Sequence, residues 1–185
     1  MKDRPKLFMV MLGCTPEGRY TEQHDIFFGI GHTVYDLKKE MIDFWPEAKG
    51  KIHMDAWREV NIVNGYRVEV VDADMPGPVS TLRLFFLNLG GYKAGVFDEL
   101  HYKLLVAATD MAEAVRQAKE TAFYMHSGFK GAASHIDDKY GVDVDDIYEI
   151  PGMLPLHHKA HYRLILSPVV AADEDRISLG YMKLY

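Results

Sequence analysis

The chain has 185 residues, a formal net charge of −6 and a hydrophobic fraction of 48%. This composition is typical of a soluble globular protein of one ordinary domain or two small ones, and it argues against a disordered or membrane-spanning chain. Acidic residues outnumber basic ones, 27 to 21. A nucleic-acid partner is therefore not expected, because such proteins carry a clustered basic surface.

The first apolar segment, residues 7–12, follows basic residues and precedes Cys14, an order that imitates a lipoprotein signal. A close copy at residues 84–89 lies in mid-chain, where no signal operates, so both segments are interpreted as strands. Cys14 is the single cysteine, which excludes an internal disulfide and fits a reducing compartment. We expect a cytoplasmic protein without membrane association.

These two apolar segments open a longer internal repeat. Superposing them brings further identical residues together: Gly13 with Gly90, Glu22 with Glu99, and His24 with His101. The second copy is longer after its helix, and with that allowance His53 and Asp55 are placed on His135 and Asp137. The prediction is repeat 1 at residues 1–73, a linker at 74–81, repeat 2 at 82–150, and a C-terminal extension at 151–185 with one strand.

Each copy shows the same order of elements. Two strands joined by a glycine-containing loop lead into a helix, whose start is marked by a capping-box pair (Thr33 with Asp36, then Asp110 with Glu113). A hairpin follows, with a tight turn at residues 64–65 and a weaker one at 146–147. The short connections predict antiparallel pairing. The expected fold class is α+β: a tandem duplication of a β-β-α-β-β unit, with antiparallel sheets packed against helices and pseudo-two-fold symmetry.

Several runs of the sequence are distinctive, above all LFMVMLGCTPEGRYTEQHDIFFGIG, FWPEAKGKIHMDAWREV and GFKGAASHIDDKYGVDVDD. They resemble the bacterial family known as domain of unknown function 1543 (DUF1543), whose members carry one or two copies of the domain. The resemblance covers most of residues 6–150 and implies a two-copy member. It implies no activity, substrate or cofactor, because none is established for the family.

The candidate functional residues are polar residues expected in both copies. Glu-x-His and His-x-Asp place both members of a pair on one face of a strand. The candidate ligand or metal site comprises Glu22, His24, His53, Asp55, Glu99, His101, His135 and Asp137. Two imidazoles and two carboxylates in each copy would suit a divalent transition metal such as Zn²⁺, Mn²⁺ or Fe²⁺.

The same pairs have a structural interpretation, in which each histidine anchors a loop or strand end and the carboxylate fixes its tautomer. The first function hypothesis is accordingly a non-catalytic ligand-binding or interaction protein built as a covalent pseudo-dimer, with a small molecule, a metal ion or a second copy of the chain as partner. The alternative is a metal-dependent or acid/base enzyme that uses the paired motifs. No catalytic residue is assigned.

Two further groups of residues could carry chemistry, but a non-functional role is expected for both. Cys14 with His24 would form a nucleophile and base, but a lone loop cysteine is more often inert. His157, His158 and His161 include a helical metal-ligand spacing, yet the flanking prolines make a helix doubtful, and we expect surface histidines there.

Overall fold

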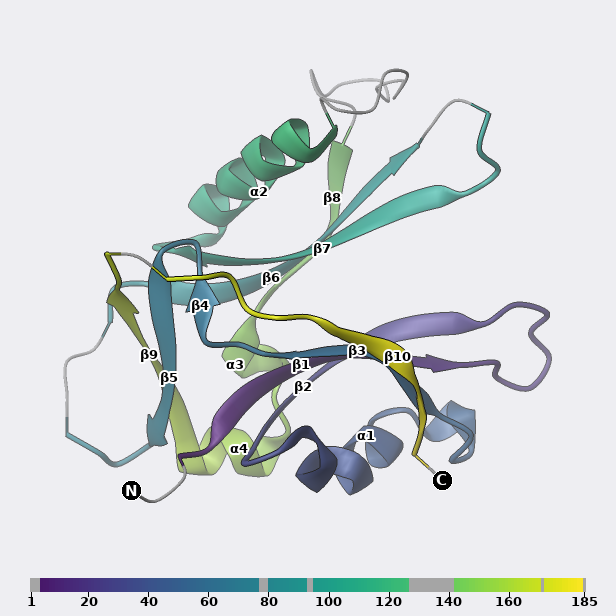
Figure 1. Ribbon diagram of the computed structural model, residues 1–185, viewed down its shortest axis with the longest axis horizontal. Helices are drawn as coiled ribbons and strands as arrows, with labels where there is room; N and C mark the ends of the chain where they lie inside the picture. The colour runs from purple at the N-terminus through teal and green to yellow at the C-terminus, as the bar shows by residue number, and fades with distance from the viewer. Residues whose placement is uncertain (1–3, 77–79, 93–94, 127–141, 171, 185) are drawn as a thin grey trace. The chain divides into compact units, whose positions relative to one another are not determined.

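The computed structural model describes residues 4–76, 80–92, 95–126, 142–170 and 172–184 (Figure 1). The chain divides into two compact units. Unit 1 comprises Met1–Val79 together with Met153–Tyr185, and unit 2 comprises Ser80–Gly152. No helix within the described ranges is long and apolar enough to cross a membrane.

The main sheet of unit 1 has, among the described residues, four antiparallel strands in the order β10-β3-β1-β2. Their bounds are β1 Lys6–Cys14, β2 Gln23–Gly31, β3 His53–Glu59 and β10 Ser178–Lys183. A second antiparallel sheet has the order β4-β5-β9, with bounds β4 Ile62–Val63, β5 Tyr66–Asp72 and β9 Tyr162–Pro168. The predicted tight turn joins β4 to β5, and Asn64 and Gly65 adopt φ angles of 34° and 85° there.

Helical segments connect β2 to β3. They are the 3-10 helix η1 (Val34–Leu37), α1 (Lys38–Phe44) and the 3-10 helix η2 (Pro46–Ala48). The predicted cap is present, because the Asp36 carboxylate accepts a hydrogen bond of 2.8 Å from the backbone N–H of Thr33. A further short helix, α4 (Leu156–His161), precedes β9.

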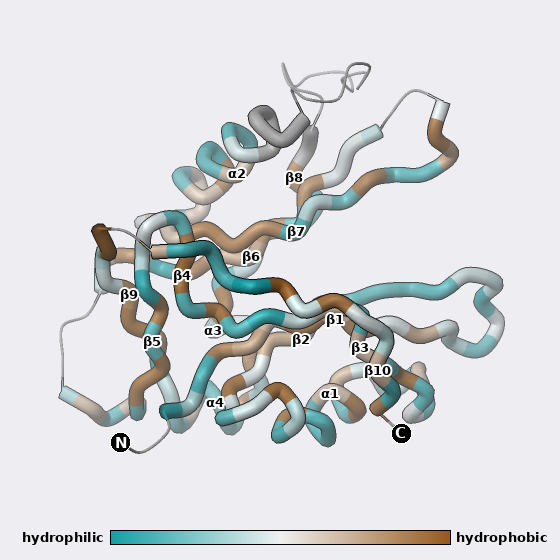
Figure 2. The backbone as a smooth tube through the Cα atoms, in the orientation of Figure 1, coloured by the Kyte–Doolittle hydropathy of each residue, from teal (hydrophilic) through white to brown (hydrophobic). Residues whose placement is uncertain are grey.

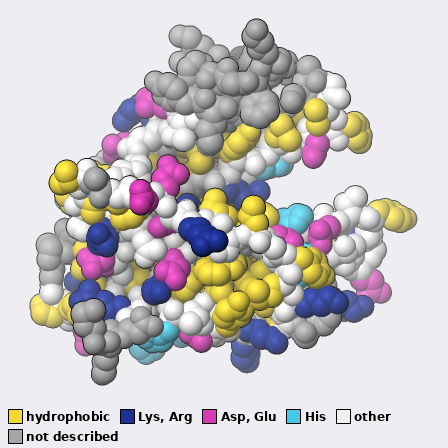
Figure 3. Space-filling model, in the orientation of Figure 1, with side chains coloured by type: hydrophobic (Ala, Val, Ile, Leu, Met, Phe, Trp, Pro, Cys, Tyr) yellow, Lys and Arg dark blue, Asp and Glu magenta, His cyan; other side chains and the backbone are white. Residues whose placement is uncertain are grey.

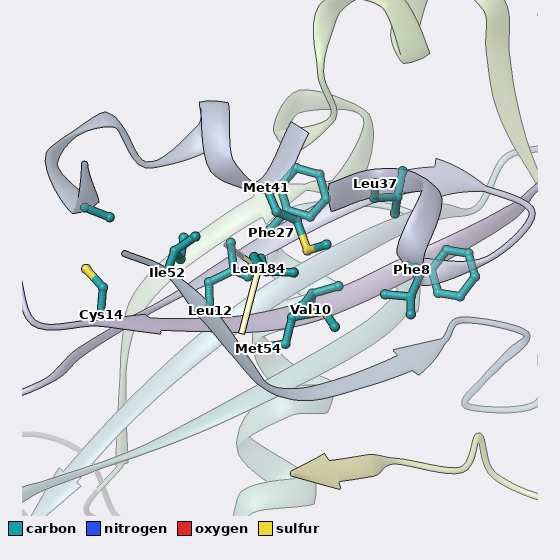
Figure 4. Packing of buried hydrophobic residues seen from close by; sticks show 12 residues of the cluster. Phe8, Val10, Leu12, Cys14, Phe27, Leu37, Met41, Ile52, Met54 and Leu184 are labelled. Carbon is teal, nitrogen blue, oxygen red and sulfur yellow. The ribbon is translucent and has the colours of Figure 1, made fainter. Parts of the chain in front are cut away.

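The core of unit 1 lies between the main sheet and this helical segment. Alternate residues of β1, namely Phe8, Val10, Leu12 and Cys14, belong to one buried cluster with Met41 of α1. Figure 4 shows these side chains with Phe27 and Leu37 in the same cluster. Because successive side chains of a strand point to opposite faces, Gly13 and its neighbours across the sheet face away from this core.

The described residues of unit 2 form a three-stranded antiparallel sheet in the order β7-β6-β8. The elements of this unit are β6 Arg83–Tyr92, β7 Glu99–Ala108, α2 Met111–His126 and β8 Val142–Glu149. Helix α2 packs on the sheet, where Ala114 and Ala118 join a buried cluster with alternate residues of β6. Figure 2 shows the apolar colouring along β6. The short helix α3 (Ile150–Met153) follows β8.

The α+β class with antiparallel sheets and packed helices is confirmed. The second cap is also confirmed, since the backbone N–H of Thr109 donates to Glu113 and that of Glu113 donates to Asp110. The predicted turn at residues 146–147 is wrong, because β8 runs without interruption through both residues. The pseudo-two-fold symmetry stays a prediction.

The C-terminal extension carries the expected strand as β9, and a second strand, β10, which the sequence reasoning missed. β9 pairs with β5 and β10 pairs with β3, so both strands complete the sheets of unit 1.

Candidate functional site: a histidine and carboxylate cluster

Three strands of unit 1 place polar residues side by side at one end of the main sheet. Gly13 on β1 lies opposite His24 on β2 and opposite His53 on β3. Residues directly opposite each other in antiparallel strands share a face of the sheet. The two histidines therefore stand on either side of Gly13, on the face turned away from the core cluster.

A β-bulge brings Asp55 to the same place. The register between β1 and β3 shifts at Met11 and Leu12, which pair with Ala56 and Met54, and leaves Asp55 as the extra residue. A bulge of this kind re-aims a side chain. A Cβ atom on Gly13 would lie 2.5 Å from Oδ2 of Asp55 and 2.6 Å from Nε2 of His53. A side chain at position 13 would therefore displace both groups, and glycine leaves them in place.

The four predicted residues of the first repeat converge. Nε2 of His53 lies 3.0 Å from Oε1 of Glu22 and 3.2 Å from Oδ2 of Asp55. Nε2 of His24 lies 3.3 Å from the same Asp55 oxygen and 3.7 Å from Oε2 of Glu22. Each carboxylate thus faces both imidazoles.

Burial divides the cluster into an inner and an outer side. His53 is 4% exposed, whereas the side chains of Glu22 and His24 are 44% and 38% exposed. Nε2 of His53 and Oδ2 of Asp55 are both buried, and neither makes a hydrogen bond to any described part of the chain. The ring of Tyr181, brought by β10, lies against the His53 ring at a centroid distance of 4.1 Å.

Cys14 belongs to the other face of the sheet. It is buried in the core cluster, and burial, with smaller contributions from the charges of Glu22 and Glu47, raises the pKa of its thiol. A raised pKa disfavours the thiolate, which is the nucleophilic form. Burial and the raised pKa therefore favour the interpretation of Cys14 as an inert core residue.

Unit 2 repeats the arrangement at the corresponding end of its sheet. Gly90 on β6 lies opposite His101 on β7. Nε2 of His101 lies 3.7 Å from Oε2 of Glu99 and 3.4 Å from Oδ2 of Asp145. A Cβ atom on Gly90 would lie 2.3 Å from that Asp145 oxygen. On the face shown in Figure 3, histidine side chains reach the surface beside acidic ones.

Strand register corrects the alignment of the second repeat. β6 and β8 shift register between Asn88, opposite Asp146, and Leu89, opposite Val144, so Asp145 is the extra residue at this bulge. Asp143 pairs with Gly90 as His53 pairs with Gly13. In the strand register, Asp143 and Asp145 therefore occupy the positions in unit 2 that correspond to His53 and Asp55 in unit 1. The two predicted residues, His135 and Asp137, lie outside the described residues.

A third cluster in unit 1 joins α1 to α4. Oε1 of Glu40 lies 3.1 Å from Nε2 of His157 and 3.5 Å from Nε2 of His158. Contrary to expectation, His158 is buried, and its Nδ1 accepts a hydrogen bond of 3.2 Å from the backbone N–H of Ile30. A neutral imidazole that accepts at Nδ1 carries its proton on Nε2. His158 therefore presents a donor to Glu40 and no lone pair to an ion.

His157 and His161 have the helical metal-ligand spacing, but they do not form a metal pair, in line with the expectation for these two residues. The two residues do lie on a helix, α4, but Nδ1 of His161 is 2.7 Å from the backbone oxygen of His157. That imidazole is directed at the backbone of α4. This third cluster is consequently a structural tie between α4, α1 and β2.

The fold and the site define an antiparallel α+β protein with a histidine–carboxylate cluster in each of two units. Residues 19–70 match the model of the family described as Domain of Unknown Function (DUF1543), so the resemblance is confirmed for this segment. The two-copy form stays a prediction.

One similar solved structure is the crystal structure of a protein Il1583 from Idiomarina loihiensis, with 21% sequence identity and a TM-score of 0.62. The similarity covers 98% of this chain and 99% of the other, and it supports the fold alone. No curated protein matches the chain.

Proposed function

We propose that the chain is a divalent-cation-binding protein whose unit 1 holds a transition-metal ion between Glu22, His24, His53 and Asp55. One observation carries the proposal: Nε2 of His53 and Oδ2 of Asp55 are buried 3.2 Å apart without a hydrogen bond to the described chain. A buried polar atom without a partner costs about 1–3 kcal/mol. An ion bound by both atoms would remove that cost.

Distances within the cluster agree with this proposal. Imidazole and carboxylate ligands lie about 2.0–2.2 Å from an ion such as Zn²⁺, so neighbouring ligand atoms around one ion are separated by roughly 3.0–3.5 Å. Three of the four separations between imidazole nitrogens and carboxylate oxygens, 3.0, 3.2 and 3.3 Å, lie in this range, and the fourth, between His24 and Glu22, is longer at 3.7 Å. Two nitrogen and two carboxylate ligands suit Zn²⁺, Mn²⁺ or Fe²⁺.

The structural interpretation of the same cluster predicts a different detail. A histidine anchored by a carboxylate donates its ring N–H along the line to the oxygen. For Nε2 of His53 neither the contact to Glu22 nor that to Asp55 has this geometry. The nitrogen lies 3.0 and 3.2 Å from two carboxylate oxygens without a hydrogen bond to either, and a shared ion would account for this.

A metal-dependent enzyme is the second candidate function, and the uneven burial of the cluster favours it. His53 lies on the inner side, whereas Glu22 and His24 are partly exposed. An ion held there would keep a coordination position open to solvent, as catalytic metal sites do, and would lower the pKa of a bound water.

The proposal also includes the cellular setting and the assembly. A single cysteine fits the bacterial cytoplasm. The repeated β-β-α-β order supports a covalent pseudo-dimer of two related units, with a small molecule or a second copy of the chain as further partner.

Metal titration of the tag-free, full-length protein tests the proposal. After chelation and dialysis, the wild type is titrated with Zn²⁺ and with Mn²⁺ by calorimetry, and bound metal is counted by elemental analysis. We expect a tight site that His24→Gln and Asp55→Asn each weaken by about 100-fold or more, because the loss of supporting residues alone costs about 10–100-fold.

The matched control is His32→Gln, at an exposed histidine directly after the other end of β2, which should leave affinity unchanged. Because His24 is partly exposed, its substitution should also leave the fold intact. Equal affinity in the wild type and in both cluster variants would overturn the proposal and favour the structural interpretation.

A further inference from the structure

We infer that unit 2 carries a second cation site, formed by Glu99, His101 and Asp145, which is weaker and less selective for Zn²⁺ than the site in unit 1. Nothing in the sequence motifs assigned Asp145 to a site. This inference extends the proposed function, but it concerns different residues and can fail separately.

The two clusters have nearly the same geometry. The imidazole nitrogen lies 3.7 Å from the glutamate oxygen in both units. It lies 3.3 Å from Asp55 in unit 1 and 3.4 Å from Asp145 in unit 2. All three ligand atoms of unit 2 lie within 4.8 Å of one another, a spacing that one ion can bridge.

The same two backbone features, a β-bulge and a glycine on the central strand, position the aspartate in each cluster. An aspartate is the extra residue at a bulge in the third strand, and a glycine on the central strand leaves room for it. A Cβ atom on Gly90 would come within 2.3 Å of Asp145, as one on Gly13 would come within 2.5 Å of Asp55. A solvated acidic side chain needs neither a bulge nor a glycine beside it. The repetition therefore indicates that both units position the aspartate for a ligand.

Glu99 in unit 2 has an additional support. The Tyr92 side chain forms a hydrogen bond with Glu99. A phenol that donates to a carboxylate fixes the direction of its oxygens. Ligating carboxylates are commonly oriented by such hydrogen bonds.

The differences between the clusters set the order of affinity. In the strand register the position of the buried His53 is occupied by Asp143, so at this position the described part of unit 2 has no imidazole. The side chains of Glu99, His101 and Asp145 are 38%, 36% and 35% exposed. Three described ligand side chains instead of four, each more exposed to solvent than His53, predict weaker binding.

Selectivity follows from the same comparison. Imidazole suits Zn²⁺, whereas carboxylate oxygens suit Mn²⁺ and Mg²⁺. Counted over the described side chains, one imidazole with two carboxylates is a harder ligand set than two of each. The ratio of Zn²⁺ to Mn²⁺ affinity should consequently be at least about tenfold smaller in unit 2 than in unit 1.

Mn²⁺ titration of the full-length protein, with free Mn²⁺ counted by electron paramagnetic resonance, tests this inference. The wild type should bind two ions with different affinities. His101→Gln and Asp145→Asn should each remove the weaker ion and leave the tighter one. Asp98→Asn, which changes an exposed neighbour of Glu99 outside the cluster, is the matched control and should bind as the wild type does.

A local readout separates this inference from the proposal for unit 1. In the His24→Gln variant, substoichiometric Mn²⁺ should broaden the amide NMR signals of Gly90 and His101 before those elsewhere. That result supports the second site even where the first site fails to bind. Unchanged weak binding in both His101→Gln and Asp145→Asn, or broadening spread over all exposed acidic residues, would overturn it.

Discussion

Asp55 and Asp145 occupy the same place in their units: each is the extra residue at a β-bulge, and its carboxylate lies beside the imidazole of His24 or His101. The bulge leaves the aspartate without a partner in the strand ladder and re-aims its side chain. In each unit this is possible because the central strand carries a glycine at the point of contact.

Gly13→Ala should weaken ion binding in unit 1 by about tenfold or more, a loss of the size seen when ligand orientation is disturbed. The new methyl group would meet both Asp55 and His53 and push them apart. Overpacking of this kind costs about 1–3 kcal/mol of stability, so the fold should persist. Calorimetric titration with Zn²⁺ measures the effect.

Gly152→Ala is the control for that substitution. A Cβ atom at position 152 meets nothing within 4 Å, and the variant should bind Zn²⁺ as the wild type does. Unchanged affinity in Gly13→Ala would show that Asp55 and His53 do not hold the ion.

The sequence predicted the two pairs of unit 1 because residues two apart on a strand share a face. It also predicted their equivalents at Glu99 and His101, because the spacing from Gly13 to Glu22 is the same as that from Gly90 to Glu99. The third strand was misaligned. Both units carry the bulge, but residues 127–141 separate α2 from β8, and the motif match to His135 and Asp137 falls within this segment, so counting along the chain did not identify Asp145.

Contacts between segments that are distant in the chain could not be predicted from the sequence either. The residues around His158 are polar, as in a surface helix. His158 is nevertheless buried, and its ring accepts a hydrogen bond from the backbone N–H of Ile30. Tyr181 contacts His53 only because β10, which lies near the C-terminus, pairs with β3. Neither contact follows from periodicity, since periodicity describes one element at a time.

Removing metal should lower the stability of unit 1. A ligand that binds only the folded state stabilises it by about 2.7 kcal/mol at 100 times its dissociation constant. Both tryptophans, Trp45 and Trp57, belong to unit 1, so their fluorescence in urea follows this unit. We expect the unfolding midpoint to rise with Zn²⁺ in the wild type and in His32→Gln. A rise of the same size in His24→Gln would contradict the proposed site.

Leu184→Ala should destabilise unit 1 by about 2–5 kcal/mol, the usual cost of deleting a buried leucine side chain. Leu184 is 3% exposed and belongs to the core cluster, although it lies near the end of the chain. Leu179 on β10 is 81% exposed, and Leu179→Ala should change the free energy of unfolding by no more than about 0.5 kcal/mol. Equal urea midpoints for the two variants would show that the extension is not part of the unit.

Acid should destabilise unit 1 through His158. Burial lowers the pKa of this histidine below its ordinary value of 6.5, and the charges of His157 and His161 act in the same direction, whereas Glu40 opposes them. The unfolded chain therefore binds the proton more readily than the folded one. This contribution to stability is complete above pH 6.5 and is lost as the pH falls toward the lowered pKa.

His158→Asn isolates this contribution, because the amide oxygen offers an acceptor to the backbone N–H of Ile30 without titrating. Between pH 8 and pH 5 the wild type should lose more stability than His158→Asn, measured as the urea midpoint of tryptophan fluorescence in metal-free buffer. His32→Asn, at an exposed position, should follow the wild type. An identical acid dependence in the wild type and His158→Asn would mean that the buried imidazole is not the group whose protonation destabilises unit 1.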